Sequence, residues 1–284
     1  MIFIRLNGRF GNQLFIWSTA ILLTEATKQN VWIVVKTKSE AHPFVQELLE
    51  RKKSEIKLTD NWVIFKTFVV IEKLFIKIPL SRKFLRSLPI FLEESSEIIN
   101  QEKLFKSKFV IGFFQRAWIA ERNSKRICGE IINLLNSYKV NVTGVDLNLP
   151  SIHVRRGDYL NSPEHWGILS RSFYEQIVAN EEATNCFTDM TKDEATEEFH
   201  EGHWRVYAQD NLSDLETFHY LVAARKLIIA NSSFSWWAGF LAASQGADVY
   251  VPEPWFKNSQ SWSEEIYPDS FIKVPAYFVD KDLK

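Results

Sequence analysis

The order of apolar and polar residues predicts alternating strands and helices in the first part of the chain. Residues 2–6 form a mostly apolar strand that runs into the polar, glycine-containing turn 7–13. The apolar residues from 14 to 22 have helical spacing, and residues 31–35 form a second strand. This β–turn–α–β order is typical of a Rossmann-like domain. The turn contains only Gly8-x-x-Gly11, which fits a nucleotide-binding turn and an ordinary asparagine-capped glycine turn equally well.

The segment 62–92 is apolar and basic, and Glu72 is its only acidic residue. Two interpretations are open. One is a set of helices that pack on the first domain and turn a basic face to solvent. The other is peripheral contact of residues 62–92 with an anionic membrane surface. Beyond this segment, the pattern predicts a strand over 109–114 and a helix over 127–135.

A second strand–helix series begins after Asn148-Leu149-Pro150, which predicts domains 1–148 and 149–284. The strands of this series are expected at 152–154, 186–189, 205–208, 227–230 and 248–251, and the helices at 173–179, 214–224 and 234–243. Ser213 and Glu216 have the spacing of a capping box at the start of the second helix. The acidic stretch 181–201 is predicted to be solvated. The fold class is therefore α/β, with two Rossmann-like domains built on parallel sheets.

Composition and charge exclude several function classes. A net charge of −1 argues against nucleic-acid binding, which requires a basic surface. Two cysteines are too few for a disulfide framework, so a reducing compartment is expected. The first residues lack a signal-peptide pattern, and no apolar run is long enough to span a membrane. These features predict a cytoplasmic protein, with peripheral attachment at the inner face of the membrane as a further hypothesis.

Two segments in the second half have the character of anion sites. Arg155 and Arg156 follow the strand at 152–154 and precede the turn at Gly157, where ligands of open α/β sheets bind. An ion pair with a nearby acid at the strand end would explain the arginines equally well. Residues 231–237 join a strand to a helix through Ser232 and Ser233, so an anion there would gain helix N–H groups. Ordinary N-capping followed by core tryptophans is the alternative.

Two anion sites in one domain suggest a diphosphate. A departing nucleoside diphosphate needs its growing charge neutralised by a metal ion or a fixed cation. Asp189 is followed by Met190, so no pair of acids stands at that strand end. The Asp-x-Asp at 280–282 lies in the C-terminal tail, where we expect it to be solvated. Arginine is therefore the expected counter-charge, and no metal cofactor is expected.

Three segments, 5–15 (RLNGRFGNQLF), 153–159 (HVRRGDY) and 229–237 (IANSSFSWW), resemble the hallmark segments of the α-1,2-fucosyltransferases of glycosyltransferase family 11. Their order and spacing cover the chain from residue 5 to about residue 245. The resemblance implies a GT-B fold of two facing Rossmann-like domains, with the N-terminal domain on the acceptor side. It also implies metal-independent transfer of L-fucose from GDP-β-L-fucose to the 2-hydroxyl of a terminal galactose, with inversion.

The same resemblance implies roles for individual residues. Arg155 would hold the β-phosphate of GDP as a catalytic residue, and Asp158 would either fix the arginines or assist deprotonation of the acceptor. His165 is a weaker candidate for that base. The remaining donor-binding residues would be His153, Asp189, Glu216, Ser232, Ser233 and Phe234. Gly11, Asn12 and Gln13 would form an N-terminal loop facing the active site.

The chain departs from the family pattern at two positions. Met190 stands where a second acid usually follows Asp189, and Thr217 follows Glu216 where a second acid can bind guanine. These departures keep open a GT-B transferase that uses another nucleotide sugar or linkage. A catalytically weak glycan-binding relative is a second alternative, because Trp166, Trp255 and Trp262 could stack against sugars.

Overall fold

The computed structural model describes residues 1–51, 55–77, 87–93, 98–138, 140, 144–200, 203–258 and 261–279. The chain divides into two compact units, Met1–Ile131 and Ile132–Lys284. The boundary predicted from the sequence, 148/149, lies further along, in the connection before the second sheet. Each sheet falls wholly on its own side of either boundary, so the predicted limits 1–148 and 149–284 remain a prediction.

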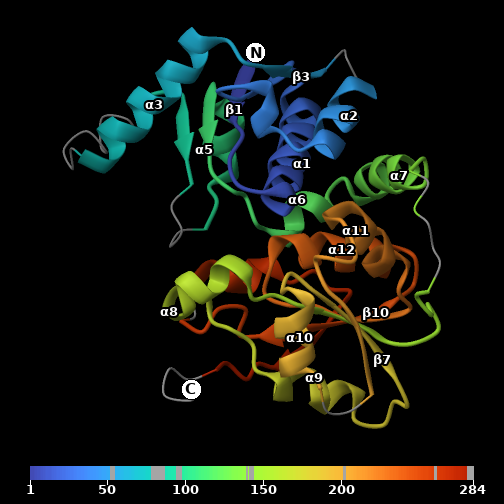
Figure 1. Cartoon of the computed structure of the whole chain (residues 1–284). Coiled ribbons are helices and arrows are strands. Elements are labelled where there is room, and N and C mark those ends of the chain that lie inside the picture. Colours follow the sequence, from blue (N-terminus) through green and yellow to red (C-terminus); the bar gives the residue numbers. More distant parts are fainter. Residues whose placement is uncertain are drawn as a thin grey trace. The chain divides into compact units, whose positions relative to one another are not determined.

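The first unit contains a five-stranded parallel sheet in the order β3-β2-β1-β5-β4. Its elements (Figure 1) are β1 Ile2–Arg5, α1 Phe10–Thr27, β2 Val31–Val34, η1 Lys38–Glu40, α2 Pro43–Arg51, β3 Ile56–Thr59, α3 Trp62–Lys77, β4 Ile90–Leu92, α5 Gln101–Lys106, β5 Phe109–Ile111 and α6 Ala117–Glu121. Helix α7 Ser124–Leu135 begins in this unit and crosses the boundary after Ile131. The chain moves outward from β1 to β3 and then returns to the other side of β1. The strand order therefore reverses between β1 and β5, where ligands of such sheets bind at the carboxyl ends.

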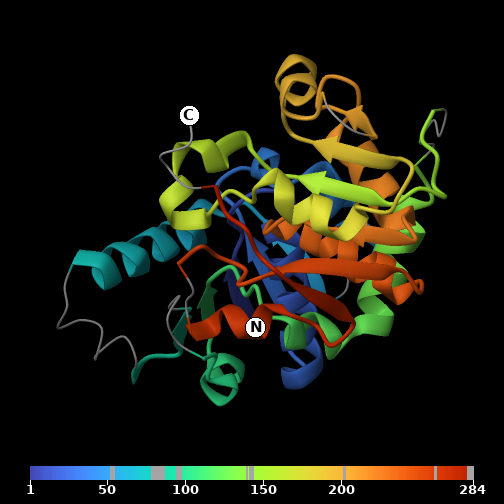
Figure 2. The same cartoon turned by 90° about the horizontal axis from the view of Figure 1, so that it is seen from below.

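The second unit contains a six-stranded parallel sheet in the order β11-β10-β9-β6-β7-β8. Its elements, also visible in the turned view of Figure 2, are β6 Ser151–Val154, η2 Gly157–Asn161, α8 Pro163–Trp166, α9 Arg171–Val178, β7 Thr184–Thr188, α10 Lys192–Glu198, β8 Trp204–Tyr207, α11 Asp214–Ala223, β9 Lys226–Ile228, α12 Ser233–Ser244, β10 Asp248–Glu253, η3 Ser261–Ile266 and β11 Phe271–Pro275. This is the standard Rossmann order 3-2-1-4-5-6. Its reversal lies between β6 and β9.

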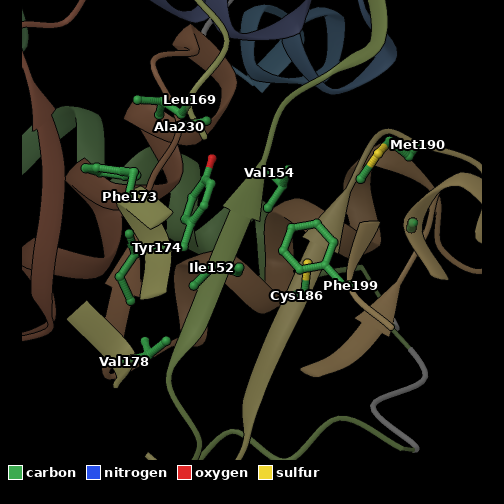
Figure 3. Close-up of a cluster of buried hydrophobic side chains, with 12 residues drawn as sticks. Ile152, Val154, Leu169, Phe173, Tyr174, Val178, Cys186, Met190, Phe199 and Ala230 are labelled. Carbon is green, nitrogen blue, oxygen red and sulfur yellow. The ribbon is translucent and has the colours of Figure 1, made fainter. Parts of the chain in front are cut away.

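Alternation along β6 divides its side chains between two layers of helices. Ile152 and Val154 are fully buried in a cluster with Phe173 and Tyr174 of α9, as Figure 3 shows. His153, which points to the opposite face, packs against Phe234 of α12. The central strand is thus buried on both faces, as expected in a parallel sheet.

The predicted strands and helices are largely confirmed, with local corrections. The strand expected over 109–114 ends at Ile111, because Phe114 has a left-handed backbone with φ of 55°. Three strands, β3, β4 and β11, were missed. All three lie at the edges of their sheets and have only three to five residues, so little apolar periodicity distinguishes them.

Candidate functional site

Three predicted residues lie at the carboxyl edge of the second sheet. Arg155 follows β6, Asp189 follows β7, and Ser232 comes shortly after β9. Because β6 is hydrogen-bonded to β7 on one side and to β9 on the other, these three strand ends are neighbours. Arg155 and Ser232 flank the point where the strand order reverses, where an α/β sheet binds its ligand.

Arg155 is held on three sides by groups of its own unit. Its Nη1 atom lies 2.8 Å from Oδ2 of Asp189, and its Nη2 atom donates a hydrogen bond to Oδ1 of Asp158. The guanidinium also lies over the ring of Tyr159, with Cζ 5.5 Å from the ring centroid. The side chain retains 15% exposure. It is therefore an oriented cation that an anion can still reach.

Asp189 organises the turn that carries Arg155. Its second carboxylate oxygen, Oδ1, accepts a hydrogen bond of 2.7 Å from the backbone N–H of Arg156. Gly157 has a φ of 22°, and a Cβ atom added there would lie 2.2 Å from Oδ2 of Asp189. Both oxygens of Asp189 are thus engaged inside the protein. Its predicted contact with the donor stays a prediction, and its observed role is to position Arg155.

Arg156 is a structural residue, unlike its neighbour. It is 5% exposed and forms a two-pronged ion pair with Glu198 of α10, with Nε 3.1 Å from Oε2. Burial lowers the pKa of Arg156, but the hydrogen bonds and charge of Glu198 outweigh this and leave it raised. Of the two arginines, Arg155 is the one presented at the strand end. Glu198 was missed because the acidic stretch was expected to be solvated.

The start of α12 provides the second part of the site. Ser232 is the N-cap, and its Oγ accepts a hydrogen bond from the backbone N–H of Phe234 at 3.3 Å. Ser233 and Phe234 are partly exposed, whereas Ser232 is buried. The N–H groups of this first turn and the helix dipole favour an anion at this position.

An aromatic group supports Phe234 from the interior. The rings of His153 and Phe218 lie 5.3 Å and 5.5 Å from it, centroid to centroid. Burial, and secondarily the charge of Arg155, lower the pKa of His153 to about 3, so its imidazole is neutral near pH 7. His153 is only 3% exposed. Its observed role is to pack beneath Phe234, and the predicted contact of His153 with guanosine stays a prediction.

A hydrogen-bond chain that the sequence did not suggest connects the two halves of the site. The hydroxyl of Tyr159 donates to the backbone oxygen of Asn231 at 2.8 Å. The Asn231 side chain in turn donates to the backbone oxygens of Trp166 and Gly167, at 2.9 Å and 3.1 Å. The Trp166 ring stacks on Tyr159 at 5.8 Å. Tyr159, whose ring lies beneath the Arg155 guanidinium, is thus hydrogen-bonded directly to the turn that precedes α12.

Met190, which departs from the family pattern, and Glu216, which precedes the second departure at Thr217, have defined surroundings. Met190 is 6% exposed and belongs to the apolar cluster of Figure 3, where a carboxylate would be desolvated. Glu216 closes the predicted capping box, because its Oε2 accepts hydrogen bonds from the backbone N–H and the Oγ of Ser213 at 2.8 Å and 2.7 Å. These two bonds hold the pKa of Glu216 below its ordinary value. Its predicted contact with guanine is not tested by this geometry.

The predicted active-site loop of the first unit is part of a helix. Gly11, Asn12 and Gln13 lie in the first turn of α1. Gln13 is 4% exposed, and its side chain donates to the backbone oxygens of Gly8 and Glu40 and accepts from the backbone N–H of His42. It therefore ties the turn after β1 to η1. Asn12, which is partly exposed, accepts a 2.7 Å hydrogen bond from Nε2 of Gln115.

Some predicted groups lie outside the described residues. These are the side chains of His165 and Trp262 and the Asp-x-Asp at 280–282. Trp255 is 1% exposed, so it is a core residue, whereas Trp166 is 37% exposed.

Within the described ranges, no three His, Cys, Asp or Glu residues are grouped as a metal ion would require. In the same part of the chain, no helix combines the length and apolar composition needed to cross a membrane.

Comparisons with known proteins agree over nearly the whole chain. The family model described as glycosyl transferase family 11 matches residues 1–273. The chain is 25% identical to an alpha-1,2-colitosyltransferase of Escherichia coli, with 95% of this chain and 97% of the relative covered. It is 22% identical to the O-antigen biosynthesis glycosyltransferase WbnK of Escherichia coli, covering 95% and 99%.

A solved structure supports the fold prediction. A variant of Arabidopsis thaliana FUT1 in complex with GDP superposes with a TM-score of 0.50 at 11% identity, covering 90% of this chain and 72% of that one. At this identity the likeness concerns the fold alone. Two α/β units with parallel sheets, as predicted for a GT-B protein, are thereby confirmed.

Proposed function

Because this chain belongs to glycosyltransferase family 11, we propose that it transfers L-fucose from GDP-β-L-fucose to the 2-hydroxyl of a terminal galactose. The transfer inverts the anomeric carbon and needs no metal ion. The observation that carries this proposal is the fixed guanidinium of Arg155 beside the start of α12, at the strand-order reversal of a Rossmann sheet. The family match supports glycosyl transfer, and this geometry supports a nucleoside diphosphate as the leaving group.

The chemical role of Arg155 follows from where charge develops. As the bond between the sugar C1 and the β-phosphate oxygen breaks, negative charge grows on the diphosphate. A guanidinium already fixed by Asp189 and Asp158 donates hydrogen bonds to that charge without reorganising. The N–H groups that begin α12 share the task, because a helix N-terminus favours an anion. Phe234 would flank the guanine ring.

The acceptor hydroxyl attacks C1 from the face opposite the leaving diphosphate, which gives inversion. Its proton must pass to a base. Asp158 remains the proposed candidate, but one of its carboxylate oxygens is engaged by Arg155. The geometry therefore favours a positioning role for Asp158 over deprotonation of the acceptor.

The decisive experiment is incubation of the protein with GDP-fucose and lactose in the presence of EDTA, with the product linkage determined by NMR. The expected product carries an α-1,2-linked fucose on galactose. Formation of a different linkage would correct the acceptor position, and activity that requires an added divalent cation would overturn the metal-free mechanism.

A second donor is favoured by a specific finding. The relative at 25% identity is a colitosyltransferase, and colitose is L-fucose without its 3-hydroxyl. Met190 also removes one carboxylate that the family pattern places after Asp189. Competition between GDP-fucose and GDP-colitose in one reaction distinguishes the two donors by the ratio of their kcat/KM values. Glycan binding that GDP does not affect, without turnover of either donor, would support the non-catalytic alternative.

Peripheral membrane contact is proposed for helix α3, within the predicted segment 62–92. Residues 78–86 of that segment lie outside the described part of the chain. One side of α3 packs on the first sheet through Phe65, Phe68 and Ile71. Residues on its other side are exposed to solvent.

The open side of α3 combines apolar and cationic residues. Trp62 and Val63 are each 67% exposed, Val70 is 53% exposed and Leu74 is 37% exposed. Exposed lysines, Lys66 and Lys73, lie among them. At about 100° per residue, these six positions occupy an arc of about 120°. The whole chain has a net charge of −1, so these lysines form a local basic patch and are not part of a generally basic surface. An anionic lipid surface would complement both the charge and the apolar side chains of this patch.

A further inference from the structure

The carboxyl edge of the first sheet contains an amide pair that has no role in the proposed donor site of the second unit. Asn12 lies at the start of α1, directly after β1, and Gln115 follows β5. Nε2 of Gln115 donates a 2.7 Å hydrogen bond to Oδ1 of Asn12 across 103 residues of sequence. β1 and β5 are the strands between which the strand order reverses. The pair therefore stands where a sheet of this type receives a ligand.

The chain is built to hold this pair in place. Gly8, with a φ of 76°, leaves room for Asn12, because a Cβ atom at Gly8 would lie 2.4 Å from Asn12 Nδ2. On the other side, Phe114 adopts a left-handed φ of 55°, which is uncommon for a bulky residue. The cost of that conformation must be met by surrounding contacts.

Those contacts come from the carboxylate of Glu93, whose side chain is 9% exposed. Oε2 of Glu93 accepts hydrogen bonds of 2.7 Å from the backbone N–H groups of both Phe113 and Phe114. Oε1 of Glu93 lies 3.4 Å from Nη1 of Arg116, which is 1% exposed. Gly112 is required here as well, since an added Cβ would approach Glu93 to 2.5 Å. The turn at 112–116 is thus rigidly anchored, and Gln115 is its partly exposed polar residue.

The pair presents complementary hydrogen-bonding groups. Once Gln115 Nε2 and Asn12 Oδ1 have bonded to each other, Nδ2 of Asn12 remains as a donor and Oε1 of Gln115 as an acceptor. A sugar hydroxyl both donates and accepts, so it can bond to both amides. In the same turn Phe113 is 44% exposed and offers an apolar surface, which suits the C–H face of a pyranose.

We propose that Asn12 and Gln115 form the acceptor-sugar subsite, which binds ring hydroxyls of the galactoside. The inference rests on the proposed function, because it takes the acceptor to be a pyranose. The residues proposed to bind the donor lie in the second unit. Disturbing the amide pair therefore changes affinity for the acceptor and leaves affinity for the donor unchanged.

Asn12→Asp provides the cleanest test. The carboxylate retains an oxygen to accept from Gln115 but loses the donor Nδ2. Loss of one neutral hydrogen bond corresponds to about a 3- to 10-fold rise in KM for lactose. KM for GDP-fucose should change much less than KM for lactose, because the residues proposed to bind the donor lie in the second unit. Gln115→Ala, which removes the acceptor atom and the pair, should raise the acceptor KM further.

Asn61→Asp is the matched control. It introduces the same charge into the same unit at an exposed position, and the new side chain can still cap α3, where Asn61 Oδ1 accepts from the backbone N–H groups of Val63 and Ile64. It should leave both KM values unchanged. Unaltered acceptor KM in Asn12→Asp and Gln115→Ala, with wild-type turnover intact, would refute the subsite alone. Absence of transfer by the wild-type protein to any galactoside would instead refute the proposed function.

Discussion

Nη1 of Arg155 lies 2.8 Å from Oδ2 of Asp189, and the two residues follow neighbouring parallel strands, β6 and β7. The carboxylate therefore fixes the direction of the guanidinium before any ligand arrives. Asp189 also accepts a hydrogen bond from the backbone N–H of Arg156. One carboxylate therefore fixes both the backbone of this turn and the orientation of the Arg155 side chain. Arg155 is thus the residue proposed to contact the diphosphate, and Asp189 is the residue that positions Arg155.

Arg155→Ala should lower kcat/KM with GDP-fucose by about 10²–10³-fold, because a preorganised donor to the leaving group is lost. Steady-state kinetics of the purified variant measures this. Arg205→Ala is the control, since Arg205 is half exposed and lies 3.7 Å from Asp146 on the surface of the same unit. Near-normal activity in Arg155→Ala would contradict the assignment of the leaving-group cation.

Gly157→Ala should reduce activity through displacement of Asp189. The added Cβ would lie 2.2 Å from Oδ2 of Asp189, and the φ of 22° already disfavours a side chain. We expect at least a tenfold loss of kcat/KM and a fall of about 1–3 kcal/mol in the free energy of unfolding. Gly129→Ala, in α7 with no atom within 4 Å of the new Cβ, should be neutral or stabilising.

Tyr159→Phe tests the connection between Arg155 and the start of α12. It keeps the ring beneath Arg155 but removes the hydroxyl that donates to the backbone oxygen of Asn231. The free energy of unfolding should fall by about 1–2 kcal/mol, and calorimetric titration should show severalfold weaker binding of GDP. Tyr207→Phe removes a comparable bond, to the backbone oxygen of Gly144, and should leave GDP affinity unchanged. Equal GDP affinities in all three proteins would contradict the connection.

The low pKa of His153 predicts that the free energy of unfolding falls as the solution becomes acidic. The folded-state pKa of about 3 lies below the ordinary value of 6.5, so the unfolded chain binds a proton at higher pH than the folded protein does. This contribution to stability is complete above about pH 6.5 and is lost as the pH falls towards 3. Urea unfolding at a series of pH values should show a shallower acid dependence in His153→Gln than in the wild type. An identical slope in both would rule out this source of acid sensitivity.

The exposed side of α3 predicts salt-sensitive binding to anionic vesicles. The wild-type protein should sediment with phosphatidylserine-rich vesicles at low salt and be released as salt screens Lys66 and Lys73, whereas phosphatidylcholine vesicles should bind little. The double variant Trp62→Ser and Leu74→Ser should bind several times more weakly. Ile98→Ser removes an apolar side chain that is 75% exposed outside α3 and should have no effect. Retained binding by the double variant, or dimerisation through α3 without vesicle binding, would refute the lipid assignment.

Much of the fold could be predicted because parallel strands bring distant motifs to one edge. Arg155 and Ser232 were expected at strand ends, and the order of the second sheet makes those ends neighbours. Helix α11 was also predictable, since the Ser213–Glu216 capping box is a local signal, and both of its hydrogen bonds are present.

Residue roles that depend on distant polar contacts could not be predicted. The partner of Arg156 is Glu198, 42 residues away, in a stretch whose composition indicated only solvation. Gln115 pairs with Asn12 across 103 residues, and the left-handed Phe114 that places it has no sequence signal comparable to a glycine. Such pairings are set by tertiary packing, which hydrophobic periodicity does not report.

The three hydrogen bonds of the buried Gln13 side chain have a consequence for how family members are compared. They give Gln13, in the segment Gly11-Asn12-Gln13, a structural role, because they hold the turn after β1 against residues 40–42. A related protein without transfer activity would gain the same hydrogen bonds from this glutamine, so the presence of Gln13 alone does not identify an enzyme. If Arg155 holds the leaving diphosphate as proposed, Arg155 and Asp189, which orients it, are the positions that distinguish an active transferase from an inactive relative.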